Sequence, residues 1–315
     1  MRFKKFLSEF NIPGQCKRYG LPLWQCPSFL FLVMGAVIIV SSLTAYVIGT
    51  RYIEEPATIA LIVLGLTGVL LVMSFIITQS FEKLAEASRM KSEFINIVSH
   101  QLRTPLTNLN WSIDFLMSGR FGEIEEKQIE YFRILKENAA RMSELISDLL
   151  TVSRIATATL PLKKEETSLF DLITKLISVI TPFASASNVQ IKFEKEESLP
   201  NVFLDPSQIR HVVENLLDNA IRYIKDKGIV EISLKKKDKN IYFGIKDTGV
   251  GIPREDQKYI FQKFFRAENV LRHQTQGSGL GLYIAKSIVE RSGGKMGFES
   301  QEGRGSTFWF TLPIK

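Results

Sequence analysis

The sequence predicts three structural parts in order: a transmembrane helical hairpin, an all-α hairpin that dimerises into a four-helix bundle, and an α+β domain with helices on one sheet face. Two long stretches without charged residues come first, then an apolar seam with alternating three- and four-residue spacing, then short strand-like and helical runs. With 45% hydrophobic and 23% charged residues, the chain is neither disordered nor collagen-like. Its two cysteines exclude a disulfide scaffold.

The transmembrane hairpin rests on two charge-free stretches. Each is long enough to cross the ~30 Å hydrocarbon core of a bilayer, and buried core helices rarely run this long without a charge. We assign transmembrane helices to residues 29–50 and 57–79, with a short external loop at 51–56. The segment 1–28 carries five basic residues and one acidic residue, and basic residues also follow the second stretch, so both termini are expected in the cytoplasm.

The net charge of +7 bears on the partners of the chain. Because basic residues gather beside the apolar stretches, they favour a lipid bilayer as the partner and argue against nucleic acid.

The second part is a helical hairpin over residues 80–156. Apolar side chains between Phe81 and Leu116 follow the seam spacing, Gly119 and Gly122 interrupt it, and a second amphipathic pattern runs to Ile155. Two such helices joined by a glycine turn are typical of a dimeric four-helix bundle.

The third part, residues 157–315, mixes strands with helices. Strands are expected at 160–166, 189–193, 230–234, 241–246 and 306–312. Helices are expected at 170–184, 206–226 and 280–292.

A histidine motif, SHQLRTPLT, covers residues 99–107. His100 lies two residues beyond the seam position Val98, so it should flank the seam and face solvent. A neutral imidazole there is a competent nucleophile, although a lone helical histidine is more often an ordinary surface residue. Pro105 inside the predicted helix is unusual, because proline removes a helical hydrogen bond.

An asparagine motif, HVVENLLDNAIRY, covers residues 211–223. Asn215 and Asn219 are four residues apart, so their amides project from one helix face. Amide oxygens are hard ligands suited to Mg²⁺ that also holds substrate phosphates. Arg222 and Tyr223 follow one turn later, where a cation can meet phosphate. Two solvated asparagines are the alternative interpretation.

Two glycine motifs follow, DTGVGIP at 247–253 and GSGLGL at 277–282. In the first, Asp247 can accept a hydrogen bond from an adenine amino group, while Gly249 and Gly251 let the backbone approach a base; an ordinary turn at a strand end is the alternative. In the second, Gly277, Gly279, Leu280 and Gly281 precede a helix, where glycine amides form a cradle for phosphate.

An aromatic cluster lies between the glycine motifs. Phe264 and Arg266 belong to it, with Phe261 and Phe265, and a polar stretch at 268–276 follows. This layout indicates a mobile lid anchored on aromatic side chains.

These motifs together resemble those of membrane sensor histidine kinases of two-component signalling. SHQLRTPLT resembles the phosphoacceptor box of that family, and residues 215–223 resemble its asparagine box. DTGVGIP, the phenylalanine cluster, GSGLGL and GRGSTF (303–308) resemble the remaining nucleotide-binding boxes in order. The resemblance spans residues 81–315, about three quarters of the chain.

The resemblance implies a homodimeric HisKA-type hairpin and an α+β sandwich of the Bergerat (GHKL) type that binds ATP and Mg²⁺. It implies that His100 is phosphorylated, that Asn219 holds Mg²⁺ with help from Asn215, and that Asp247 reads adenine. It further implies a response regulator receiver domain as partner, and a place in the bacterial inner membrane. Thr104 matches the position that orients water in members with phosphatase activity. The nucleotide pocket and lid would also involve Arg222, Tyr223, Gly249, Gly251, Phe264, Arg266, Gly277, Gly279, Leu280 and Gly281.

The sequence departs from the family pattern in three ways. Gln101 replaces the usual acidic residue after the histidine, and Arg222 replaces the usual lysine. Neither a periplasmic sensor nor a HAMP-like linker is visible.

The sequence also bears on two other functions, a hydrolytic ATPase and a pseudokinase. A hydrolytic ATPase of the same nucleotide fold needs a glutamate four residues before the Mg²⁺ asparagine, where this chain has Asn215; Glu214 points about 100° away around the helix. A pseudokinase that binds ATP and acts as a membrane-tethered scaffold is the other alternative, and Gln101 is its support.

Changing Gln101→Glu is expected to speed autophosphorylation at neutral pH. The glutamine oxygen can accept a hydrogen bond from Nδ1–H of His100 and orient the ring, but it cannot stabilise charge as a carboxylate does. Since general-base help contributes about 10²–10⁴-fold and phosphoryl transfer depends mostly on positioning, the wild type should be slowed rather than inactive. Time courses at saturating ATP measure the difference, and a variant no faster than wild type contradicts this account of Gln101.

Overall fold

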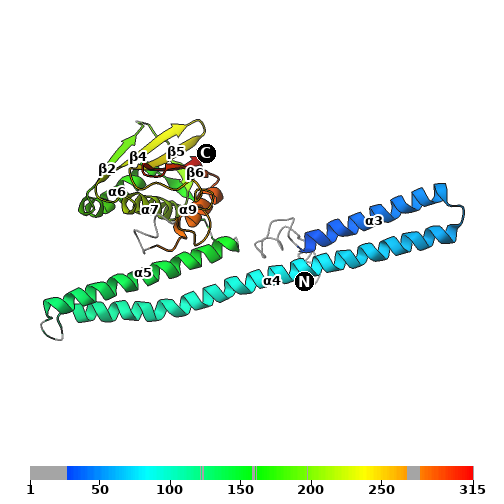
Figure 1. The fold of residues 1–315 in the computed structure, drawn as a ribbon, viewed down its shortest axis with the longest axis horizontal. Coiled ribbons are helices and arrows are strands. Elements are labelled where there is room, and N and C mark those ends of the chain that lie inside the picture. Colours follow the sequence, from blue (N-terminus) through cyan, green and yellow to red (C-terminus); the bar gives the residue numbers. More distant parts are fainter. Residues whose placement is uncertain are drawn as a thin grey trace. The chain divides into compact units, whose positions relative to one another are not determined.

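The computed structural model (Figure 1) describes residues 27–120, 122, 124–157, 160, 162–196, 198–267 and 277–314. Nearly all of the basic segment 1–28 therefore lies outside the described residues, as does the predicted polar lid stretch 268–276. The chain divides into two compact units. One comprises residues 1–112 and 153–160, and the other comprises residues 113–152 and 161–315.

Two helices carry the apolar stretches of the first unit. Helix α3 (Pro27–Tyr52) and helix α4 (Pro56–Met117) are long and apolar enough to cross a membrane, with mean hydropathies of 2.3 and 2.7 in their most apolar windows. The predicted loop 51–56 is shorter than expected, because α3 continues through Tyr52. Pro56 starts α4, which suits a residue without a backbone N–H.

Helix α4 runs without interruption for 62 residues, so the predicted second membrane span and the first helix of the dimerisation hairpin form one element. Pro105 lies inside it. A third helix, α6 (Leu169–Ala186), also has the length and composition of a membrane span. It buries Leu169, Ile173 and Leu176 in the core of the α+β domain, so we interpret it as a core helix.

Helix α5 (Glu126–Ala156) follows α4 in the chain and contacts it within each unit. In the first unit, Ser153 Oγ near the end of α5 donates to the Ser92 carbonyl in α4 at 3.2 Å. In the second unit, Lys136 Nζ in the first half of α5 pairs with Asp114 Oδ1 near the end of α4 at 2.6 Å. These contacts confirm the predicted helical hairpin.

The most deeply buried row of α4 lies one residue past the predicted seam. Ala85, Ser92, Ser99 and Ile113 are spaced by seven or fourteen and are buried. The four leucines of the seam, Leu84, Leu102, Leu109 and Leu116, are exposed in the single chain, whereas Phe81, Ile95 and Val98 are half-buried. Small side chains permit close packing but give a weak hydropathy signal, so sequence patterning missed the buried row.

The α+β domain contains a five-stranded sheet in the order β2-β4-β5-β7-β6. Its strands are β2 (Val189–Lys195), β4 (Gly228–Lys237), β5 (Asn240–Asp247), β6 (Lys295–Gln301) and β7 (Gly305–Pro313). β2 pairs with β4 in parallel and the other pairs are antiparallel. A second sheet pairs β1 (Glu165–Thr167) with β3 (Val202–Leu204).

Helices α6, α7 (Pro206–Arg222) and α9 (Gly281–Arg291) cover one face of the large sheet (Figure 1). Strand alternation sends Ile232, Phe243 and Phe310 into the core beneath them, where the two phenylalanine rings stack at 4.8 Å. The domain is therefore the predicted α+β layer structure, with its helices on one sheet face.

Several predicted boundaries were wrong. The strand predicted at 160–166 is confined to β1, and strands β3 and β6 were not predicted. α7 ends at Arg222 rather than at 226, because Tyr223 leaves the helix as its C-cap and the chain soon enters β4. β6 has the sequence KMGFESQ, whose glycine and polar residues are poor strand formers, so its pairing with β7 decides its structure.

Candidate functional site

A cavity of about 590 Å³ lies in the second unit. α5, α7, the end of β5 and the segment before α9 all contribute to its wall. Of the predicted site residues it is lined by Asn215, Asn219, Arg222, Tyr223, Asp247, Gly251, Arg266, Gly277, Gly279 and Gly281. Tertiary folding thus brings most of three separate motifs together.

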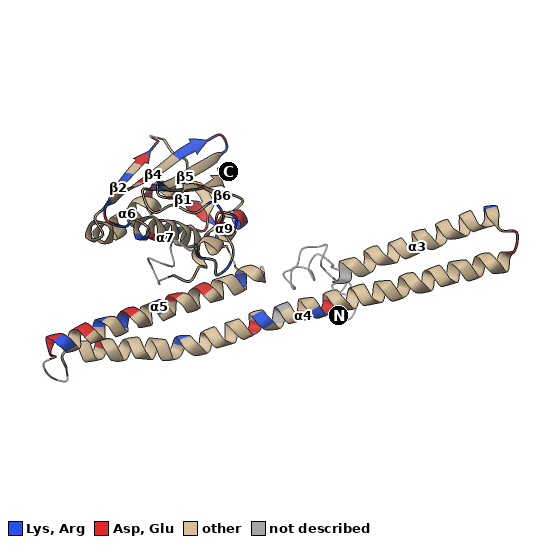
Figure 2. Cartoon of the chain, viewed as in Figure 1, with Lys and Arg blue, Asp and Glu red and all other residues tan. Residues whose placement is uncertain are grey.

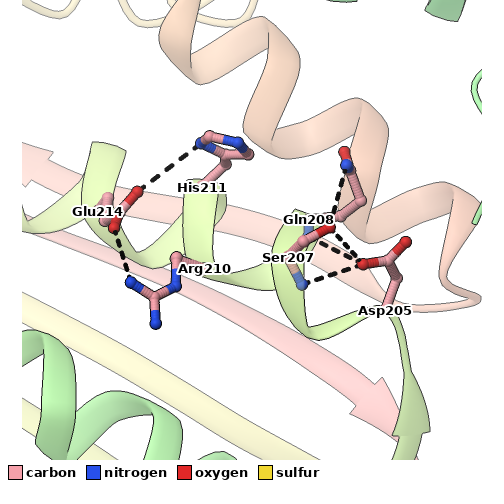
Figure 3. A network of polar contacts seen from close by, with 6 residues as sticks. All are labelled: Asp205, Ser207, Gln208, Arg210, His211 and Glu214. Carbon is pink, nitrogen blue, oxygen red and sulfur yellow. Dashed lines mark hydrogen bonds and ion pairs between the residues drawn. The ribbon is translucent and has the colours of Figure 1, made fainter. Parts of the chain in front are cut away.

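Helix α7 is held at its N-terminus by Asp205. The Asp205 carboxylate accepts hydrogen bonds from the backbone N–H of Ser207 (3.0 Å) and Gln208 (3.2 Å), as Figure 3 shows, and from Lys163 N (2.8 Å). Burial acts to raise the pKa of Asp205, but the bond donated by Ser207 Oγ (2.6 Å) together with these backbone bonds outweighs it, and the pKa is lowered. The cap gives α7 a defined start, from which its polar face runs to the cavity.

Glu214 belongs to a different face of α7. Its carboxylate lies 3.8 Å from Arg210 Nη1 and 3.7 Å from His211 Nδ1 (Figure 3). It does not line the cavity, so the structure offers no glutamate on α7 as a general base for a water molecule there.

The two asparagines of α7 are hydrogen-bonded to each other. Asn219 Nδ2 donates to Asn215 Oδ1 at 3.0 Å. A Cβ atom at position 281 would overlap the Asn215 amide, so only glycine fits where α9 begins. Because the Asn215 oxygen is already an acceptor, the amide oxygen of Asn219 is the better placed to bind a hard cation such as Mg²⁺.

Arg222 and Tyr223 lie at the end of α7. Arg222 Nε donates to Asp218 Oδ1 at 2.7 Å, and this carboxylate raises the pKa of Arg222 although burial opposes the shift. Burial also raises the pKa of Tyr223. A phosphate that binds Arg222 must therefore share the guanidinium with Asp218.

Asp247 lies at the end of β5 and is 5% exposed. Its Oδ1 accepts from Gly249 N at 2.8 Å and from Ser306 N at 3.2 Å, so Oδ2 is the oxygen left for a ligand. Burial raises the pKa of Asp247 to about 6, and the two backbone bonds only partly offset this. Tyr223 O accepts from Val250 N at 3.0 Å, which ties this turn to the end of α7.

The glycine segment before α9 packs on the aromatic cluster. Gly279 has φ +66°, and a Cβ there would lie 2.8 Å from the Phe264 carbonyl carbon. Phe264 N donates to Gly279 O at 2.9 Å, while Phe264 itself has φ +64°. Gly249, Phe264 and Leu280 do not line the cavity, so their contribution is to shape the turns around it.

Four carboxylates of the cavity were missed by sequence reasoning. Glu137, Glu144 and Asp148 come from α5, and Asp218 comes from α7. Ser278 Oγ, within the glycine segment, donates to Asp148 Oδ2 at 3.0 Å. Burial raises the pKa of Asp148 and, together with the neighbouring Asp148 and Asp218 charges, that of Glu144. The i,i+4 spacing of Asp218 and Arg222 could have indicated Asp218 from the sequence. No sequence pattern indicated the carboxylates of α5.

The histidine motif lies on α4 in the first unit. His100, Gln101 and Thr104 are all exposed. The neighbouring Ser99 is 1% exposed, so the helix turns His100 to solvent as the seam predicted. The roles of these three residues stay predictions.

Two family descriptions match the chain. "His Kinase A (phospho-acceptor) domain" matches residues 90–158, and "Histidine kinase-, DNA gyrase B-, and HSP90-like ATPase" matches residues 204–315. The first contains the histidine motif, and the second contains every cavity residue from α7 onward.

Curated relatives are sensor kinases. The chain is 34% identical over 229 residues to the circadian input-output histidine kinase CikA of Synechococcus elongatus, covering 72% of this chain and 30% of that protein. It is 32% identical over 242 residues to the adaptive-response sensory kinase SasA of a Synechococcus strain, covering 76% of this chain and 64% of that protein. The chain therefore spans between about a third and two thirds of the length of these two relatives.

Solved structures share the fold. The full-length ShkA structure in complex with AMPPNP superimposes with a TM-score of 0.60 at 26% identity, covering 70% of this chain and 45% of that chain. Histidine kinase ThkA in complex with the response regulator protein TrrA gives a TM-score of 0.51 at 22% identity, covering 74% of this chain and 66% of that chain. The second similarity concerns the fold alone.

Nucleotide affinity should fall in acid because of Asp247. The sequence motif predicts that the Asp247 carboxylate accepts from the adenine amino group; with a pKa of about 6 it is mostly protonated at pH 5, so the dissociation constant should rise about tenfold between pH 7 and pH 5. Calorimetry on the full chain measures the dissociation constant, and Asp247→Asn should bind more weakly and lose this pH dependence.

Since the pKa of Asp247 is raised, the ligand-free fold should also lose stability as pH rises from about 4 through about 6.

Asp148→Asn should tighten nucleotide binding about three- to tenfold, because it removes a negative charge from the wall of a polyphosphate cavity while keeping an acceptor for Ser278. Nucleotide titrations of the full chain test this. Ser278→Ala is the matched control, since it breaks the same hydrogen bond without changing charge. Equal effects of the two substitutions would mean that the hydrogen bond, not the charge, matters.

Proposed function

Because the chain belongs to the sensor histidine kinases of two-component systems, we propose that it phosphorylates His100 with Mg·ATP and passes the phosphoryl group to an aspartate of a response regulator receiver domain. The observation that carries the proposal is the cavity, where Asn219, Asp247 and the glycine segment meet in a chain that also exposes His100.

The residues of the cavity suit ATP and Mg²⁺. Asp247 Oδ2 accepts a hydrogen bond from the adenine amino group, while the amides at Gly279 and Gly281 and the N-terminus of α9 face the phosphates. The oxygen of Asn219, held by Asn215, would ligate Mg²⁺ bound with the nucleotide. When bound, Mg²⁺ neutralises charge on the β- and γ-phosphates. The carboxylates that line the cavity then repel the anionic product and so favour its release.

His100 supplies the nucleophile. Its Nε2 attacks the γ-phosphorus in line with the leaving oxygen, while the Gln101 oxygen accepts from Nδ1–H and holds the ring in that tautomer. Thr104 lies one turn further along α4 and orients water for dephosphorylation in the phosphatase mode of the protein. Both side chains are exposed on α4, which agrees with access by a mobile ATP domain and by a receiver domain.

Dimerisation and membrane insertion complete the proposal. The leucines of the seam, Leu102 and Leu109 among them, are exposed in the single chain, and a second copy would cover them. α3 and the first part of α4 span the bacterial inner membrane as a hairpin with both termini in the cytoplasm. With three residues between the two helices, the stimulus arises in the bilayer, in a membrane partner or in the cytoplasm.

The full chain in lipid nanodiscs, incubated with γ-labelled ATP, should incorporate label that His100→Ala abolishes. His211→Ala is the matched control, because His211 is an exposed histidine on α7 that does not line the cavity. Asn219→Ala should reduce labelling by at least about a hundredfold, since the Mg²⁺ ligand is lost. Label that persists in His100→Ala would refute this acceptor; tight ATP binding without label in the wild type would favour a pseudokinase.

A further inference from the structure

The large sheet has a second face that no described helix covers (Figure 1). Strand alternation separates the two faces: Ser306 and Phe308 line the nucleotide cavity, whereas Thr307 and Trp309 line a groove on the opposite face. This groove has a volume of about 510 Å³. A ligand on the uncovered face therefore leaves the nucleotide cavity open.

Two aromatic rings lie flat on this face. The rings of Tyr242 and Trp309 stack at 6.2 Å with 24° between their planes. A Cβ at position 244 would lie 2.8 Å from the Tyr242 ring, and one at position 297 would overlap the Trp309 ring, so each ring lies over a glycine. Tyrosine and tryptophan with partly exposed rings are the side chains that settle at the headgroup level of a bilayer.

Lysines surround the aromatic pair. Lys235, Lys236 and Lys237 line the groove, and exposed Lys239 follows in the turn between β4 and β5; Figure 2 shows the basic end of β4. Within the described parts of the chain, none of these four lysine side chains forms an ion pair with a carboxylate. Glu299 is the one carboxylate among the residues described along the groove. Unpaired lysines beside interfacial aromatics match an anionic lipid surface.

The attachment of the domain brings it within reach of such a surface. In the first unit, Ser153 near the end of α5 bonds to Ser92 of α4, only 11 residues beyond Phe81, where the charge-free stretch ends. At 1.5 Å per residue, this level of α4 lies about 17 Å from the edge of the bilayer. The ATP domain begins a few residues after α5, and a domain of ~150 residues is roughly 38 Å across.

We propose that the uncovered sheet face, with Tyr242, Trp309 and the lysines at 235, 237 and 239, docks on the anionic cytoplasmic leaflet of the membrane in which the chain is anchored. The inference rests on the membrane topology proposed above. Because the tether holds the domain at a high local concentration, a weak lipid contact is enough to populate the docked state. Docking holds the ATP domain away from His100 while its nucleotide cavity stays open, which makes leaflet charge a regulator of the kinase.

Trp309 can report the contact itself. In the full chain with Trp24→Phe and Trp111→Phe, Trp309 is the remaining tryptophan. Nanodiscs of brominated phosphatidylcholine with about 30% phosphatidylglycerol should quench its emission by at least about a third, and about 0.5 M NaCl should reverse the quenching. Brominated discs of phosphatidylcholine alone should quench it much less.

A matched pair of variants assigns the effect to this face. Lys235→Ala, Lys237→Ala and Lys239→Ala together should abolish the quenching. Lys175→Ala, Lys225→Ala and Lys227→Ala remove the same charge from exposed positions outside the groove and should leave quenching unchanged. Absence of quenching in the anionic discs, or quenching that survives the first triple substitution, overturns the proposal. Protection of Trp309 from acrylamide in detergent also overturns it, because a protein would then cover the face.

Phosphorylation measured in the same discs separates this proposal from the proposed function. If Trp309 emission is not quenched in discs in which His100 becomes labelled, the docking proposal is overturned and the kinase function stands. If Trp309 emission is quenched but His100 is not labelled, the kinase function is refuted and the docking proposal stands. If docking restrains the ATP domain, the first triple lysine variant should label His100 about two- to fivefold faster in anionic discs and at the wild-type rate in neutral discs.

Discussion

The packing of helix α7 against the sheet is the constraint on which the nucleotide cavity depends. Ile209, Val213 and Leu217 bury one side of the helix completely, so the opposite side must present Asn215 and Asn219 to the cavity. Asp205 fixes the start of the helix, and its end is joined to the Asp247 turn through the bond between Val250 N and Tyr223 O. A register shift in α7 would separate groups that come from three different motifs.

Electrostatics explains why this cavity is suited to a nucleotide with its cation rather than to a bare anion. Five carboxylates line it, against three guanidinium groups, those of Arg141, Arg222 and Arg266; the carboxylates are those of Glu137, Glu144, Asp148, Asp218 and Asp247. Arg222 is already paired with Asp218. Because the carboxylates outnumber the guanidinium groups, a divalent cation that accompanies a polyphosphate would reduce its repulsion from this wall. Burial raises the pKa values of both Glu144 and Asp148, and the neighbouring charges of Asp148 and Asp218 raise that of Glu144 further.

The two faces of one sheet serve different partners in this scheme. Alternate residues of β7 line the cavity and the groove on the uncovered face, because successive side chains of a strand point to opposite faces of the sheet. In the proposed topology, α4 continues from the membrane-spanning segment to His100 as one helix. The lipid composition of the leaflet and the position of α4 would then both act on the proposed phosphorylation of His100.

Local chemistry in the sequence determined the helix-length apolar stretches, the exposed position of His100 and the pairing of Asn215 with Asn219, because each depends on spacing along one element. It also indicated Asp247 and the glycine segment, since turns and helix starts need particular residues. Only the tertiary structure decided that Asp148 reaches Ser278, that Ser306 holds Asp247 and that β6 is a strand. These depend on contacts between segments 59 to 130 residues apart, or on pairing that overrides a weak local preference, and no periodicity records such distances.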